Sequence, residues 1–194
     1  GHITSKVKES FPNVEFSGID VSLSAIEYAH QKYKGIDFIV GNAYDPPYSK
    51  AFFDIIICNN TWEHITDPVK MLLNLRKILK DDGKVIMSTP SRYRVMNLVK
   101  SMGGKKVSIT KYHVTEYTVG QVIEQFGFAG FSVKKIQGSH VKGQGGSFFT
   151  RIFIHKLVKP IGKVFLNILG SHHILDSTAF YLAHKEINGS LKIN

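Results

Sequence analysis

The sequence predicts an α/β protein built on a doubly wound, mostly parallel sheet. The first observation is that residues 53–90 follow the pattern strand, loop, helix, turn, strand. The second is the β-branched run from Ile55 to Ile57, which suits a strand buried on both faces. The third is that helical and extended patterns alternate before residue 53. Strand–helix–strand units feed parallel sheets through right-handed crossovers, so this class of sheet follows.

Four elements are predicted before residue 53. Apolar residues spaced four apart predict a helix over 3–11, and an extended run over 14–19 ends in Asp20. A second helix, capped by a serine at position 22 or 24, ends at Gly35. A short strand follows over 36–40.

The central unit has the clearest helix start in the chain. Asp67 offers an N-cap acceptor and Pro68 fits the first helical position. Apolar residues at helical spacing follow it, and residues 81–83 are expected to end the helix. The next strand is predicted to open at Lys84.

After Pro90 the pattern predicts further elements of both kinds. A helix is expected within 93–102, and Thr118 with Gln121 forms a capping box for another. Strands are expected over 131–136 and 177–183. The apolar and basic stretch 148–169 predicts two helices, broken at a proline and a glycine.

Composition fits one domain with an ordinary core. The chain has 194 residues, a formal net charge of +10 and a single cysteine, which excludes a disulfide framework. No apolar run is long enough to span a membrane, and no signal peptide is visible. The charge favours anionic partners such as phospholipid, phosphorylated substrate or nucleic acid, or serves general solubility.

Polar residues follow three predicted strands, where ligands bind in open α/β sheets. Asp20 could accept the ribose hydroxyls of a nucleoside, or supply a negative charge to the next helix. Asn42 could bond an adenine amino group, with the Ala43 N–H beside it, or shape a turn. Residues 58–61 line the mouth of the central strand, and two consecutive asparagines there favour a function.

Glu63, His64 and His113 are candidates for acid–base work. A glutamate and an adjacent histidine cannot complete a metal site alone, so no metal is expected. A buried pair that ties the loop to the sheet is favoured over direct catalysis. His113 lies on a loop expected above the same crevice and is a candidate base, although loop histidines are more often structural.

These segments together resemble class I S-adenosylmethionine-dependent methyltransferases, especially those that act on small molecules, quinones and glycolipid precursors. The resemblance runs from Gly1 to about Phe131 and more loosely to Ala183. Its motifs are GIDVS at 18–22, GNA at 41–43, FDIIICNNTWEHITDP at 53–68, LRKILKDDGKVIMSTP at 75–90 and HVTEYTVGQVIEQFGF at 113–128.

The resemblance implies a Rossmann-like fold, with a hairpin that slots strand 177–183 antiparallel into the sheet, and S-adenosylmethionine as cofactor. It also implies that Gly1 closes a glycine-rich turn whose preceding strand is missing from this chain. The implied cofactor-binding residues are Gly1, Asp20, Val21, Asn42, Ala43, Cys58, Asn59 and Thr61.

The catalytic candidates under the resemblance are His113 and His64, as bases for an O, N or C nucleophile. Asn60 stands where some quinone-type relatives carry the first glutamate of a metal motif, which again argues against a metal. The single domain then divides into a cofactor-binding half (1–90), substrate or cap segments (91–176) and a last strand with a tail (177–194).

Three hypotheses remain open from the sequence. The first is a cytoplasmic methyltransferase for a small or lipid-linked anionic acceptor, with possible membrane contact through 148–169, a segment that could equally cap the active site. The second is a Rossmann-type NAD(P)-dependent oxidoreductase, because a strand-end Asp suits that cofactor too; the predicted hairpin strand favours the first. The third is a truncated, non-catalytic domain that binds a partner or a membrane surface. Nucleic acid is a weaker partner, because no recognition motif is evident.

Overall fold

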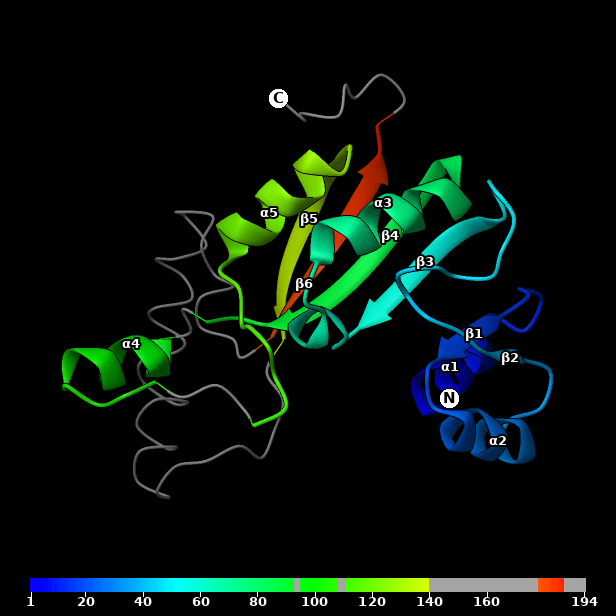
Figure 1. The fold of residues 1–194 in the computed structure, drawn as a ribbon, viewed down its shortest axis with the longest axis horizontal. Coiled ribbons are helices and arrows are strands. Elements are labelled where there is room, and N and C mark those ends of the chain that lie inside the picture. The colour runs from blue at the N-terminus through cyan, green and yellow to red at the C-terminus, as the bar shows by residue number, and fades with distance from the viewer. Residues whose placement is uncertain (93–94, 108–110, 140–177, 187–194) are drawn as a thin grey trace.

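The computed structural model describes residues 1–92, 95–107, 111–139 and 178–186, and it has the alternating α/β order that the sequence predicts (Figure 1). The elements are α1 (His2–Ser10), β1 (Ser17–Asp20), α2 (Leu23–Lys32), β2 (Asp37–Val40), β3 (Phe53–Asn59), the 3-10 turn η1 (Trp62–His64), α3 (Pro68–Ile78), β4 (Leu79–Pro90), α4 (Val95–Met102), α5 (Val119–Phe128), β5 (Phe131–Ser139) and β6 (Thr178–Lys185).

The strands form two sheets within the described residues. β1 and β2 pair in parallel, and a second sheet has the order β3-β4-β6-β5. β3 and β4 are parallel, whereas β6 runs antiparallel to both β4 and β5. The strand β6 therefore lies between its neighbours in the antiparallel direction that the resemblance implies, and the four-stranded sheet is mixed rather than mostly parallel.

Local sequence explains where the helices begin. The Ser22 hydroxyl accepts the Ala25 N–H at the start of α2, and the Asp67 carboxylate accepts the Lys70 N–H at the start of α3. Thr118 and Gln121 make both hydrogen bonds of a capping box at α5. Each satisfies backbone donors that the first helical turn leaves unpaired, which confirms these predicted starts.

The end of α3 differs from the expectation. The helix ends at Ile78, and Leu79 already pairs with Phe53 of β3. The next pair in register joins Ile55 to Lys84, so residues 80–83 bulge out of the ladder. Leu79 is fully buried, and burial of its side chain draws the chain into the sheet before the expected Asp-Asp-Gly stop.

The main core lies between α3, α5 and one face of the four-stranded sheet (Figure 1). Its members come from the loop after β3, from both helices and from β4, β5 and β6. They are Trp62, Met71, Leu72, Leu75, Ile78, Leu79, Val85, Met87, Val122, Phe126, Ala129, Phe131, Ala179, Tyr181 and Ala183. A smaller core of Ile26, Ala29, Ile36 and Phe38 joins α2 to the β1–β2 pair.

The other face of the four-stranded sheet is more exposed than predicted. Ile55 and Ile57 of β3 are 50% and 46% exposed in the described structure, so the expectation of burial on both faces is wrong there. β3 is an edge strand of this sheet, and its alternate residues Ile56 and Cys58 pack against the main core. The β-branched run therefore has the alternating burial of a half-covered strand.

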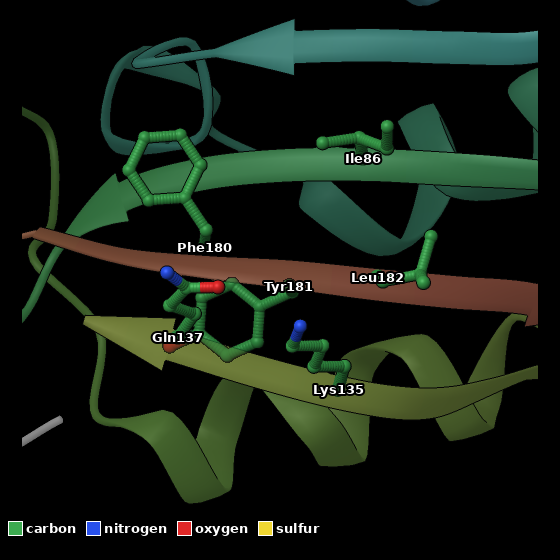
Figure 2. A pocket seen from close by; sticks show the side chains of 6 residues that line it. All are labelled: Ile86, Lys135, Gln137, Phe180, Tyr181 and Leu182. Atoms are coloured by element: carbon green, nitrogen blue, oxygen red, sulfur yellow. The ribbon is translucent and has the colours of Figure 1, made fainter. Parts of the chain in front are cut away.

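A shallow hollow lies on strands β4, β5 and β6 (Figure 2). It is lined by Ile86, Lys135, Gln137, Phe180, Tyr181 and Leu182. The stretch 148–169 lies outside the described residues. Within the part of the chain that the structure describes, no helix is long and apolar enough to cross a membrane.

Candidate functional site

Asp20 is exposed at the carboxyl end of β1, where the chain turns into α2. One of its carboxylate oxygens accepts the Ser22 N–H at 2.9 Å. The residue also lines a small hollow with Gly1, Gly18 and residues of α1 and α2. The carboxylate thus holds the turn with one oxygen and keeps further acceptor capacity for a ligand, so both interpretations of Asp20 from the sequence are compatible with its geometry.

Gly1 and Val21 border the same region in different ways. A Cβ on Gly1 would lie 2.8 Å from the ring of Tyr33 and 3.0 Å from the Cβ of Ala29, which leaves little room for a side chain. Val21 is 72% exposed, so only its backbone has a fixed place beside Asp20. Close approach of backbone at Gly1 is what a glycine-rich ligand turn requires, and its role stays a prediction.

Asn42 lies just after the end of β2, the strand that pairs with β1. Its side-chain oxygen accepts the Tyr44 N–H at 2.9 Å, and its backbone bridges to Asp45. These bonds make Asn42 a turn residue. Its amide N–H groups have no hydrogen bond among the described residues, so contact with a purine ring stays a prediction. Ala43 packs against the main core.

The strand β3 ends at Asn59, the loop after it begins with Asn60 and Thr61, and Ser88 of β4 holds this strand end. The Ser88 hydroxyl donates to the Asn59 side chain at 2.8 Å, and the Asn60 N–H donates to the Ser88 carbonyl at 3.0 Å. Asn60 has a φ of 48°, a left-handed conformation that asparagine tolerates better than most residues. The paired asparagines therefore have a structural role at this strand end. The Thr61 hydroxyl bonds back to the Asn59 carbonyl.

The Cys58 thiol belongs to the core rather than to the crevice. Its side chain packs against the main core, and burial raises the pKa of the thiol to about 12. A neutral thiol that is half-buried against the core neither ligates nor attacks, so any contact of Cys58 with a cofactor would come from its backbone.

Native Cys58 is expected to resist alkylation. At pH 8 the raised pKa lowers the thiolate fraction about a thousandfold relative to an ordinary cysteine, and the core also blocks access. Mass spectrometry after iodoacetamide treatment should find Cys58 unmodified in the folded protein and modified in urea. The raised pKa also makes stability depend on pH. Above pH 9.0 the Cys58 thiol of the unfolded chain deprotonates while the folded thiol stays neutral. The free energy of unfolding should therefore fall as the pH rises from 9.0 toward 12. Rapid native labelling would contradict this burial.

Glu63, His64 and His113 are brought together by the fold. The His64 and His113 rings meet edge to face with centroids 5.1 Å apart. The Glu63 side chain is 1% exposed and accepts the Thr89 hydroxyl at 3.2 Å. The Val114 and Thr115 N–H groups both donate to the Glu63 carbonyl, at 2.7 and 3.3 Å. The loop that carries His113 is therefore fixed against the loop after β3.

Each imidazole is held through its Nδ1 atom. Nδ1 of His64 lies 2.9 Å from the Tyr112 carbonyl oxygen, and Nδ1 of His113 lies 3.2 Å from a carboxylate oxygen of Glu116. Glu116 is 1% exposed, and sequence reasoning did not single it out. No helical spacing marked it, because His113 and Glu116 both lie in the loop before α5.

Trp62 is the second residue of this region that sequence reasoning missed. It is fully buried, stacks on Phe126 at 5.7 Å and donates from Nε1 to the Gln125 side-chain oxygen at 2.9 Å. Gln125 and Phe126 belong to α5, so Trp62 anchors the loop after β3 to a helix 63 residues later. A lone tryptophan in a polar loop was the signal for such an anchor.

The predicted site residues thus form two groups. Asp20, Val21 and Asn42 lie at the ends of the adjacent strands β1 and β2, with Gly1 beside them. Asn59, Thr61, His64 and His113 lie around the ends of β3 and β4. Within the described residues no hydrogen bond joins the two groups.

Comparisons with known proteins agree on one family. A family model described as a methyltransferase domain matches residues 1–128. The chain is 29% identical over 87 residues to a demethylmenaquinone methyltransferase of Thermotoga maritima, a match that covers 45% of this chain and 38% of that protein. It is 32% identical over 91 residues to a malonyl-[acyl-carrier protein] O-methyltransferase of Bacillus cytotoxicus, over 46% of this chain and 32% of that protein. The chain therefore spans about a third of the length of each of these relatives.

The fold agrees with these matches. The crystal structure of a magnesium protoporphyrin IX methyltransferase from Synechocystis PCC 6803 with bound SAH superimposes with a TM-score of 0.61 at 12% identity. That match covers 95% of this chain and 69% of the other. At this identity the likeness concerns the fold alone.

Proposed function

The chain belongs to this methyltransferase-domain family, and from that premise we propose that it transfers the methyl group of S-adenosylmethionine to a small-molecule acceptor. The cofactor supplies a methyl group that its sulfonium already activates. The task of the protein is then to align the cofactor and the acceptor, an effect worth up to about 7–11 kcal/mol of the barrier.

The observation that carries the proposal is the exposed carboxylate of Asp20 at the end of β1. It borders a hollow with Gly1 and Gly18, and only one of its oxygens is tied to the Ser22 N–H. A carboxylate at this edge of a parallel strand pair can accept two ribose hydroxyls. The donor and acceptor chemistry therefore fits the nucleoside part of S-adenosylmethionine.

The remaining cofactor contacts extend from this point. We assign Val21 and Gly1 to backbone contacts beside Asp20, and Asn42 with Ala43 to the adenine ring. The Asn42 oxygen already accepts the Tyr44 N–H, so its amide N–H groups are the ones that would donate to a ring nitrogen. The backbone of Cys58, Asn59 and Thr61 would face the methionine end.

His64 and His113 are assigned to the acceptor end. They lie beside the loop after β3, with their Nδ1 atoms held by the Tyr112 carbonyl and by Glu116. The Nε2 atoms are then the ring atoms that can act on the nucleophile of the acceptor. His113, whose side chain is 13% exposed and sits against a buried carboxylate, is the better-oriented of the two.

A small or lipid-linked anionic acceptor fits the chain best. The net charge of +10 favours anionic molecules, and one relative is a methyltransferase for demethylmenaquinone. The doubly wound arrangement belongs to the same proposal, because α2 connects the parallel strands β1 and β2, and α3 connects the parallel strands β3 and β4.

Calorimetry with S-adenosylmethionine and with NAD tests the proposed function. We expect saturable binding of S-adenosylmethionine to the wild-type chain and none of NAD at the same concentrations. Binding of NAD alone would replace the proposal with a nicotinamide-dependent oxidoreductase. Binding of neither cofactor would reject both functions for this chain.

A further inference from the structure

We propose that Glu63, His64 and His113 form a binding site for a divalent transition-metal ion. One carboxylate oxygen of Glu63 and one ring nitrogen of each histidine lie within 4.8 Å of one another. Ligands of one ion at about 2.0–2.2 Å from it lie about 3–4 Å apart, so small side-chain adjustments close this set. The three residues come from η1 and from a loop 49 positions later in the chain.

The hydrogen bonds of the two histidines have the arrangement of metal ligands. A ligating histidine usually uses one ring nitrogen for the metal and gives the other N–H to a carbonyl or a carboxylate. Here Nδ1 of His64 faces the Tyr112 carbonyl and Nδ1 of His113 faces Glu116. Both contacts select the tautomer in which Nε2 carries a lone pair. Among the described residues, neither Nε2 atom has a hydrogen bond.

The environment of Glu63 independently calls for a cation. Its side chain is 1% exposed, and among the described residues the carboxylate has one hydrogen bond, from the neutral hydroxyl of Thr89. No lysine or arginine pairs with Glu63 within the described part of the chain. Burying a carboxylate without a compensating charge is costly, and a metal ion between Glu63 and the two histidines would supply that charge.

The site is rigid on one side and open on the other. Two backbone N–H groups of the His113 loop fix that loop to the Glu63 carbonyl, so the ligand-bearing segments are already joined. Glu63 is buried and His113 is half-buried, whereas His64 is exposed, which leaves a path for an ion to enter. Two imidazoles and one carboxylate leave coordination positions free for water or for an oxygen of an acceptor.

The ligand set also predicts which ions bind. Imidazole nitrogens favour zinc, cobalt and similar ions, whereas Mg²⁺ prefers oxygen ligands and water. The side chain of Asn60 is not among the ligands, because it lies against Ser88. The absence of a glutamate at position 60 therefore does not remove the proposed site, because His113, a residue distant in sequence, supplies the third ligand. When an ion is bound, the Nε2 lone pairs are occupied, so His64 and His113 act as ligands and not as the bases assigned above. Binding of the ion does not depend on the proposed function, since a chain that fails to bind S-adenosylmethionine can still bind an ion.

Titration of the whole chain with Co²⁺, followed by visible absorbance and calorimetry, tests the site. We expect about one equivalent of Co²⁺ to bind, competition by Zn²⁺ and no competition by Mg²⁺ at the same concentration. His64→Ala, His113→Ala and Glu63→Gln should each weaken Co²⁺ binding at least about tenfold. Glu63→Gln keeps the shape of the side chain, and circular dichroism verifies that each variant is folded.

His30→Ala is the matched control, because it removes an exposed imidazole from α2, the helix that packs against the β1–β2 sheet. It should leave the affinity for Co²⁺ unchanged. Equal affinity of the wild type and the folded His64→Ala and His113→Ala variants would overturn the proposal. So would a loss of binding in the control, or the absence of any saturable binding to the wild type. Binding of Co²⁺ without binding of S-adenosylmethionine would support the metal site and reject the proposed function.

Discussion

Replacement of Asp20 by alanine is expected to weaken S-adenosylmethionine binding at least about tenfold, which corresponds to about 1.4 kcal/mol or more. Hydrogen bonds to a charged group contribute about 1.5–3 kcal/mol each, and Asp20 is assigned to the ribose hydroxyls. Isothermal titration calorimetry measures the change directly. The effect should appear in the dissociation constant, with little change in thermal stability, because the Asp20 side chain is exposed.

Two variants separate recognition from local structure. Asp20→Asn keeps an oxygen for the Ser22 N–H but removes the charge, so it should retain the turn and still lose affinity. Asp54→Ala removes a 77% exposed carboxylate from the amino end of β3, where it pairs with Lys80, and should bind the cofactor like the wild type. Unchanged affinity of Asp20→Ala would mean that Asp20 only shapes the turn into α2.

Local rules predicted the elements well because each start is set by nearby residues. Asp67 with Pro68 and Thr118 with Gln121 begin α3 and α5 where the sequence placed them. The antiparallel direction of β6 was expected only through the family resemblance. The end of α3 was displaced by a tertiary contact, since Leu79 gains more by burial beside Phe53 than by continuing toward Gly83.

The candidate site was less predictable because its contacts join distant parts of the chain. The sequence identified His64 and His113 separately, but their meeting depends on backbone bonds from the His113 loop to the Glu63 carbonyl. Likewise, the pair Asn59 and Asn60 suggested ligand binding, whereas a bond to Ser88, 28 residues after Asn60, gives them a structural role. No local pattern contains such information.

Trp62→Ala is expected to lower the free energy of unfolding by about 3–5 kcal/mol, the usual cost of deleting a fully buried large aromatic side chain. Trp62 is completely buried against Phe126, and the vacated volume lies between the loop after β3 and α5. Urea denaturation followed by circular dichroism measures the loss. Met102→Ala, at an 89% exposed position of α4, should change stability by no more than about 0.5 kcal/mol.

The hydrogen bond from Trp62 to Gln125 can be separated from the packing by a double-mutant cycle. Trp62→Phe keeps most of the ring but leaves the half-buried Gln125 oxygen without its donor, at a cost of about 1–2 kcal/mol. Gln125→Leu removes the partner, so the double variant should be more stable than the sum of the single effects predicts. Simple additivity would mean that packing on Phe126 alone anchors the loop. A positive coupling would mean that α5 fixes the segment carrying Glu63 and His64, so variants of this bond should weaken Co²⁺ binding without touching a ligand.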